Sequence, residues 1–147
     1  MDTFRRVYDA SVAIHVVAAI AGFGATFTYP VIQLVAERRD ATALGLTAIL
    51  AISRWVAVPA AIVVGITGIY QATSGPYDFG DGWVATGFGL YLGVMGVATG
   101  YLAPAYRRAL RAPDRAGYDA AMRGPNVVGT LLSAAIITIA VLMVIKP

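Results

Sequence analysis

The sequence predicts an all-α protein, a bundle of four transmembrane helices joined by short loops. Of its 147 residues, 59% are hydrophobic and only 13% are charged, about half the charged share of an average soluble domain. The charges also leave four apolar segments, each long enough for the roughly 20 residues that cross a bilayer. Because the bilayer offers the backbone no hydrogen-bond partners, such segments form helices. We therefore expect residues 1–147 to form one multi-pass membrane domain.

The position of each predicted helix follows from the charges and the turn residues. No charge interrupts the first apolar run, and Arg54 is the only charge within the second. The third run begins at Trp83, after a glycine-rich loop, and the fourth follows Gly124-Pro125, a dipeptide typical of helix boundaries. The expected helices cover about residues 7–36, 42–72, 83–106 and 125–145.

The loops predict how the bundle lies in the membrane. The segments "ERRD" (37–40) and "YRRALRAPDRAGYDAAMR" (106–123) fall at one end and contain seven arginines, whereas the loop 73–82 at the other end is acidic. The positive-inside rule assigns the arginine-rich loops to the cytoplasm, so both termini should face outward. The net charge of +3 is thus explained by membrane orientation and does not indicate a nucleic-acid-binding face. We expect a protein of the bacterial cytoplasmic (inner) membrane.

Stripes of small and polar residues run along the predicted helices. Steps of three and four residues keep side chains on one helical face, and Arg54 and Asn126 lie on such stripes of the second and fourth helices. Membrane helices associate through small residues and interhelical hydrogen bonds. We therefore expect the stripes to meet inside the bundle. The members on the first helix include His15, Gly22, Tyr29 and Gln33.

The third predicted helix has a doubled small-xxx-small pattern made only of glycines. Such a pattern lets two helices approach closely. We expect it to pack helices together, within the bundle, between copies in a homo-oligomer, or against a larger membrane complex. The glycines are Gly89, Gly93, Gly96 and Gly100.

Arg54 is the one charge placed deep in an apolar run. An arginine left near the bilayer centre costs roughly 2.5–3.5 kcal/mol on the insertion scale. We expect it to turn inward and pair with Gln33, Tyr29 or a bound anion, either as a structural clasp or as a ligand group. Asn126, near the inner end, is expected to form an interhelical hydrogen bond.

His15 is the only histidine, and it lies in the apolar stretch "SVAIHVVAAIAGFG" (11–24). One imidazole cannot complete a zinc or copper site, but it is enough for one axial bond to a haem iron. The alternative is a packing histidine that bonds to a neighbouring helix. The absence of cysteine from the sequence excludes disulfides and thiolate metal ligands.

Several of these residues resemble one superfamily of small bacterial membrane proteins. The chain combines His15 and Pro30 with "RWVAVP" (54–59) and "MRGPNVVGTLLSAAIITIAVLMVIKP" (122–147). This order resembles the CopD copper-resistance proteins and the HemJ-type protoporphyrinogen oxidases, with uncharacterised bacterial families of unknown function as the most similar members. The chain departs from the oxidase pattern at Val31, and "WVATGFG" (83–89) lacks the lysine of that pattern, which argues against the oxidase activity itself.

The resemblance implies a role for His15, because the matching histidine of the oxidase family is associated with haem. Tyr91 should reach about the depth of His15 on the third helix, and Gly22 lies on the same stripe as His15. Met95 is a candidate second axial ligand. The expected haem b site therefore consists of His15 as the iron ligand, surrounded by Gly22, Tyr91 and Met95.

Three functions follow from these patterns. The first is a membrane protein that binds haem b through His15 in a redox or haem-related role. The second is an accessory or structural subunit that packs through its glycines. The third is a small transporter or channel that uses Arg54. No residue pattern identifies a catalytic group.

Overall fold

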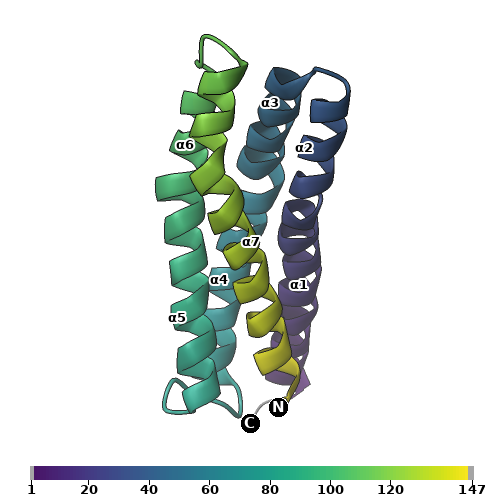
Figure 1. The fold of residues 1–147 in the computed structure, drawn as a ribbon. Coiled ribbons are helices and arrows are strands. Elements are labelled where there is room, and N and C mark those ends of the chain that lie inside the picture. The colour runs from purple at the N-terminus through teal and green to yellow at the C-terminus, as the bar shows by residue number, and fades with distance from the viewer. Residues whose placement is uncertain (1, 146–147) are drawn as a thin grey trace.

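The computed structural model describes residues 2–145 and consists of four long helical rods (Figure 1). By length and composition each rod can cross a membrane, so the predicted all-α architecture is confirmed. The first rod joins α1 (Asp2–Phe27) to α2 (Tyr29–Arg38), and the second joins α3 (Thr42–Ile52), η1 (Ser53–Ala57) and α4 (Val58–Ser74). The third joins α5 (Gly82–Val97), η2 (Ala98–Leu102) and α6 (Ala103–Ala109), and the fourth is α7 (Arg115–Ile145).

The two ends of the bundle differ in the loops that they carry. The termini and the loop 75–81 lie at one end, which we call the terminal end (Figure 1). The loops 39–41 and 110–114 lie at the other end, which we call the arginine end. The up-and-down order expected from the charges is therefore present.

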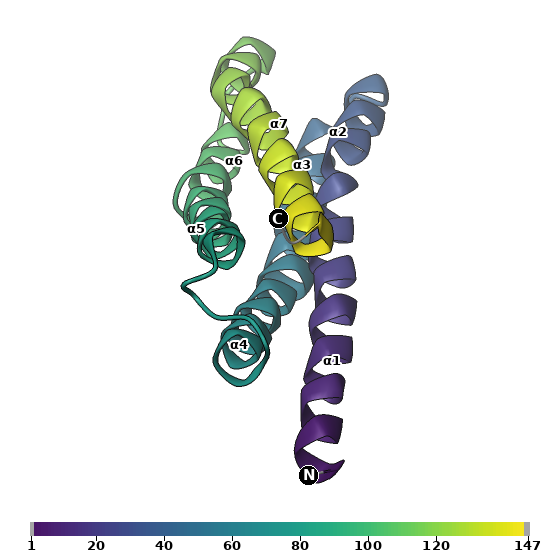
Figure 2. The ribbon, with the colours of Figure 1, turned by 90° about the horizontal axis from the view of Figure 1, so that it is seen from below.

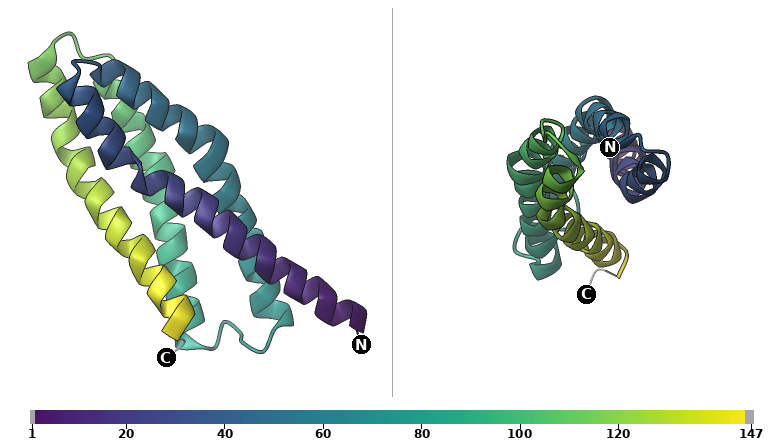
Figure 3. Two further views of the ribbon diagram at one scale, coloured as in Figure 1. Left: turned by 90° about the vertical axis from the view of Figure 1, so that its right-hand side faces the viewer. Right: turned by 45° about the horizontal axis from the view of Figure 1, so that its top comes forward.

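The rods form an open ring in which neighbours along the chain lie side by side (Figure 3). The α1 helix packs most extensively on α4, and α5 and α6 pack on α7, which lies between the third rod and α1 (Figure 2). Glycine allows the closest approach in the first pair, because a methyl group added at Gly22 would lie 3.1 Å from Ala60 Cβ. Contacts are few both between α2 and α7 and between α4 and α5. The ring is thus loosely closed at these two places.

The largest apolar core lies at the arginine end, where α3, α6 and α7 meet. Leu46 and Ile49 of α3 are its most deeply buried side chains. They pack with Leu102, Tyr106 and Met122 from the opposite rods. This core fixes the positions of α3, α6 and α7 beside the site described below.

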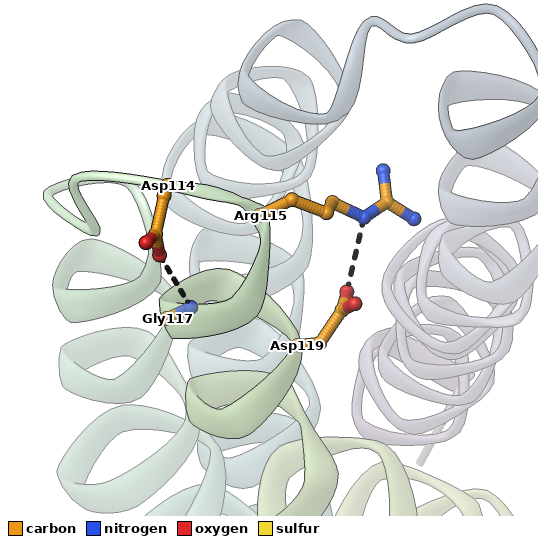
Figure 4. A network of polar contacts seen from close by, with 4 residues as sticks. All are labelled: Asp114, Arg115, Gly117 and Asp119. Carbon is orange, nitrogen blue, oxygen red and sulfur yellow. Dashed lines mark hydrogen bonds and ion pairs between the residues drawn. The ribbon is translucent and has the colours of Figure 1, made fainter.

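The fourth helix begins at Arg115 and not near residue 125, as the sequence suggested. Pro125 lies inside α7. A proline has no backbone N–H and so removes one hydrogen bond of the helix. Packing against the other rods keeps this turn helical. The true start is capped by Asp114, whose carboxylate accepts a hydrogen bond from the Gly117 N–H at 2.8 Å (Figure 4). An exposed ion pair of 3.1 Å between Arg115 and Asp119 adds local support to this first turn.

All four rods are irregular at about the same level. The first rod breaks at Thr28 between α1 and α2, the second and third contain the π-helical turns η1 and η2, and α7 contains Pro125. A proline follows closely after each of the first three irregularities, at positions 30, 59 and 104. Each of the four irregularities lies roughly ten residues, or about 15 Å, from the arginine end of its rod. π-helical turns occur frequently at functional sites.

Candidate functional site: a cavity between the four rods

A cavity of about 380 Å³ lies at the level of these irregularities and extends from it toward both ends of the bundle. All four rods contribute to its wall, which is mostly apolar. Among the described residues that line it there is no lysine or arginine, and Glu37 is the one residue with a charged side chain. Its polar lining residues are Thr26, Tyr29, Gln33, Glu37, Ser53, Thr99, Tyr106, Asn126, Thr130 and Ser133.

Tyr29 and Gln33 place two unpaired polar atoms in this wall. The two residues are four positions apart on α2, so their side chains lie on one face of the helix. The Tyr29 Oη and Gln33 Nε2 atoms are buried and have no hydrogen-bond partner in the described part of the chain. Ser53 lies beside the Tyr29 hydroxyl but forms no hydrogen bond of acceptable distance and angle with it.

Several hydroxyl groups of the lining differ from these two, because they are satisfied by their own helices. Thr26 donates to the Phe23 carbonyl at 2.7 Å, and Ser133 donates to the Gly129 carbonyl at 3.0 Å. Thr99 and Thr130 bond in the same way to backbone carbonyls four residues earlier. Such local bonds are the usual arrangement of serine and threonine in a membrane helix. The pair on α2 therefore differs from these groups, because its two polar atoms are buried and lack a partner among the described residues.

The cavity gathers five of the eight site residues expected from the sequence. Its lining includes Gly22, Tyr29, Gln33, Met95 and Asn126. The expectation that the stripes of the first and fourth helices meet is thus supported.

Sequence reasoning missed Ser53, Glu37 and Tyr106 as members of this wall. Glu37 continues the α2 face at a further step of four residues, a signal that was available in the sequence. Ser53 had no such signal, because the π-helical turn changes which residue of that segment faces inward.

His15 lies outside this cavity and packs on α4. Its Nδ1 atom is 2.8 Å from the hydroxyl oxygen of Thr67, and its ring touches Gly68. The single hydroxyl hydrogen of Thr67 is donated to the Val63 carbonyl at 2.6 Å. When the Thr67 hydroxyl donates to this carbonyl, the matching tautomer of His15 donates from Nδ1–H to Thr67 and leaves Nε2 unprotonated. The hydrogen-bonded packing role expected as an alternative is present.

The structure does not assemble the expected haem surroundings around His15. Tyr91 donates its hydroxyl to the Ala61 carbonyl at 2.9 Å. Gly22 faces Ala60 in the α1–α4 contact, and Met95 lines the cavity, which His15 does not reach. His15 and Tyr91 both lie against α4, at Gly68 and Gly65, whereas Gly22 and Met95 line the cavity.

Arg54 is exposed and does not pair with Gln33 or Tyr29, contrary to the expectation. Its guanidinium lies 5.5 Å from the ring centroid of Trp55, and the cavity lining does not include it. The cause is η1, whose wider turn rotates Arg54 out of line with the buried residues Ala57 and Ala61. The transporter hypothesis therefore loses the residue on which it depended.

The glycine stripe of α5 and η2 faces outward. A methyl group added at any of these positions would meet no atom of another helix within 4 Å. The stripe therefore does not pack helices within the bundle, contrary to one of our expectations, and packing between copies stays a prediction. The glycines concerned are Gly89, Gly93, Gly96 and Gly100.

Comparison with sequence families identifies the family of the chain. A family described as a predicted integral membrane protein, DUF2269, matches residues 11–147. The chain belongs to this DUF2269 family. No curated protein and no solved structure matches the chain.

Within the described residues of this DUF2269 protein, no group of three or more histidine, aspartate or glutamate side chains could hold a metal ion. The chemistry that the cavity offers is hydrogen bonding inside an apolar wall. Ligand sites are usually built in this way, from a mostly apolar lining with a few well-placed polar groups.

Proposed function

We propose that this protein binds one amphipathic molecule of the bilayer in the cavity between α2 and α7. One observation carries the proposal: two hydrogen-bond donors, Tyr29 Oη and Gln33 Nε2, are buried in the cavity wall and have no partner among residues 2–145. A buried donor left unsatisfied costs about 1–3 kcal/mol. A ligand that supplies an acceptor removes this cost, and its apolar part is stabilised by the surrounding wall.

The position of the cavity indicates from where the ligand enters. Tyr29 lies nine residues from Arg38, or about 13 Å from the arginine end at 1.5 Å per residue. The two donors thus lie in the half of the bilayer at the arginine end, whereas the lining from Gly22 to Glu37 spans about 22 Å and continues past the bilayer centre. The positive-inside rule makes the half that holds the donors the cytoplasmic leaflet, and the few contacts between α2 and α7 offer one route of entry from the side.

Native mass spectrometry of the purified protein tests this function. We expect the wild-type protein to retain one small molecule, which an organic solvent extracts for identification. Replacing both donors, with Tyr29→Phe and Gln33→Leu, should reduce the bound fraction at least tenfold because the acceptor loses both partners. Tyr101→Phe is the matched control, because Tyr101 is at a similar height but does not line the cavity. Equal occupancy in all variants would disprove the proposed site.

A second candidate function, haem b binding, is supported by the hydrogen bond of His15. A haem-ligating histidine commonly donates one ring N–H to a neighbouring acceptor and binds iron through the other nitrogen. The bond from Nδ1 to Thr67 leaves Nε2 in the required form. Bound haem b would supply one-electron redox chemistry. The resemblance to the CopD and HemJ-type proteins also supports this candidate, although Gly22, Tyr91 and Met95 lie elsewhere.

An absorption spectrum separates this candidate from the first. Protein produced with ample haem should show a Soret band that His15→Ala abolishes. Thr67→Val should shift or weaken the band, because it removes the group that fixes the imidazole. Haem-replete protein without Soret absorption would rule out the second candidate and leave the cavity proposal intact.

A packing role for α5 rests on the outward position of its four glycines. We propose that a second copy of the chain, or a subunit of a membrane complex, covers this face. Close helix contact through small residues is a common mode of association in bilayers. Its test is among the predictions of the Discussion.

A further inference from the structure

We infer that the polar end of the cavity ligand is an uncharged carbonyl oxygen carried by a lipid-soluble molecule, and that an isoprenoid quinone is its source. The inference rests on the proposed binding function and goes further by naming the chemistry of the ligand. It follows from three features of the cavity wall: its charge, the direction of its free hydrogen bonds and the helices that carry them.

The charge of the wall excludes an anionic head group near Tyr29. Among the described lining residues there is no arginine or lysine that could compensate a buried phosphate or carboxylate. Arg54, the nearest deep arginine in the sequence, is exposed beside Trp55. A charge buried without a partner is strongly unfavourable. The group that reaches Tyr29 is therefore neutral.

A cationic ligand is equally disfavoured at this depth. Glu37 is the one acidic residue of the lining, and it is exposed near the arginine end, eight residues from Tyr29. The spacing corresponds to about 12 Å along the helix. An ammonium group paired with Glu37 would leave Tyr29 Oη and Gln33 Nε2 unsatisfied.

The unpaired Tyr29 Oη and Gln33 Nε2 require a hydrogen-bond acceptor. A phenolic hydroxyl donates one hydrogen, and the amide nitrogen of Gln33 has two to donate and accepts none. Both are on one face of α2, so a single oxygen atom near that face can accept from either. Among the neutral oxygens with this capacity we take the carbonyl, which is present in a quinone and in the ester of an acylglycerol.

A second part of the wall favours the quinone. Asn126 and Met95 line the cavity from α7 and α5, on other rods than the donors of α2. A quinone carries carbonyl oxygens at opposite edges of one flat ring, so it can accept from α2 and from the Asn126 amide together. An ester carbonyl offers one acceptor on a flexible chain, and it leaves the second wall unused.

Calorimetric titration of the purified, delipidated protein tests the inference. The probes are decylubiquinone and a short-chain menaquinone, with dioctanoylglycerol as the ester-bearing comparison. We expect the quinones to bind with 1:1 stoichiometry. Tyr29→Phe and Gln33→Leu should each raise the quinone Kd about tenfold, the usual effect of one lost hydrogen bond. Asn126→Leu should raise the Kd of the quinones and leave that of dioctanoylglycerol unchanged, and Tyr101→Phe should change neither.

The outcomes distinguish the inference from the function beneath it. Tight binding of dioctanoylglycerol without quinone binding would keep the carbonyl and overturn the quinone. A phosphate-bearing lipid as the native occupant would overturn the neutral head group while leaving the cavity as a binding site. No bound molecule and no binding of any probe would overturn both. Circular dichroism of each variant verifies that it folds.

Discussion

Two glutamines of this protein allow the missing hydrogen bond in the cavity to be measured. Gln33 Nε2 is buried without a partner, whereas Gln71 Nε2 donates to the Ser11 carbonyl at 3.3 Å in the α1–α4 contact. The same change, glutamine to leucine, therefore removes an unsatisfied group at one site and a satisfied one at the other. The two variants differ in what they remove and not in the residue that they introduce.

The expected effects have opposite signs in the ligand-free protein. Gln33→Leu removes a desolvation cost of about 1–3 kcal/mol and adds apolar surface to the cavity wall, so the free energy of unfolding should rise by about 1 kcal/mol. Gln71→Leu breaks a hydrogen bond and leaves the Ser11 carbonyl unpaired, so the free energy of unfolding should fall by about 1 kcal/mol. Each corresponds to a shift of about 2–4 °C in the unfolding temperature for a chain of this size.

Thermal unfolding of delipidated protein, followed by circular dichroism in one detergent, measures both shifts. Gln33→Leu should also lose the stabilisation that added ligand gives the wild-type protein. A protein that becomes more stable and loses binding has exchanged function for stability, as expected of a binding residue. If Gln33→Leu lowers the unfolding temperature as much as Gln71→Leu does, then Gln33 has a structural partner and the cavity proposal fails.

Three further predictions concern the outside of the bundle. Cysteines introduced as Ser74→Cys and Ala112→Cys should react with an impermeant thiol reagent from opposite sides of the membrane, and labelling from one side would refute the orientation. Arg54→Leu should leave ligand affinity unchanged, since Arg54 does not line the cavity, and should not lower the free energy of unfolding, because it removes an exposed charge from a membrane-spanning segment; calorimetry that shows lost binding would place Arg54 in the site. Gly93→Leu should preserve the fold of the monomer but abolish oligomers in native mass spectra, whereas unchanged oligomers would remove the α5 face as their interface.

The sequence was sufficient for the four rods, because helix formation in a bilayer depends on local hydropathy. The main error, the start of α7, arose from Pro125, which marks a helix end in water but is tolerated inside a packed membrane helix. The Tyr29 and Gln33 face was also predictable, since both residues lie within the regular helix α2 and keep its period. Local pattern was enough wherever the helix was regular.

The rest of the site depends on how the helices are rotated about their axes, which periodicity alone does not determine. The prediction for Arg54 was wrong because the π-helical turn η1 is wider than an α-helical turn. It changes the direction in which the side chains before it point relative to those after it. His15 was expected to face Tyr91, but each bonds to a different part of α4, through Thr67 and the Ala61 carbonyl. The packing of whole helices determines which hydrogen-bond partners such side chains meet.

The irregularities themselves explain why a cavity exists at this level. Straight helices with small-residue stripes would close on each other along their full length, as α1 and α4 do at Gly22. A proline or π-helical turn interrupts the regular hydrogen bonding and bends the helix there. Because all four rods are irregular at one height, their arginine-end halves need not follow the contacts of the terminal halves. The core around Ile49 then holds α3, α6 and α7 together, and α2, which packs on α3, forms the wall that carries the two unpaired donors.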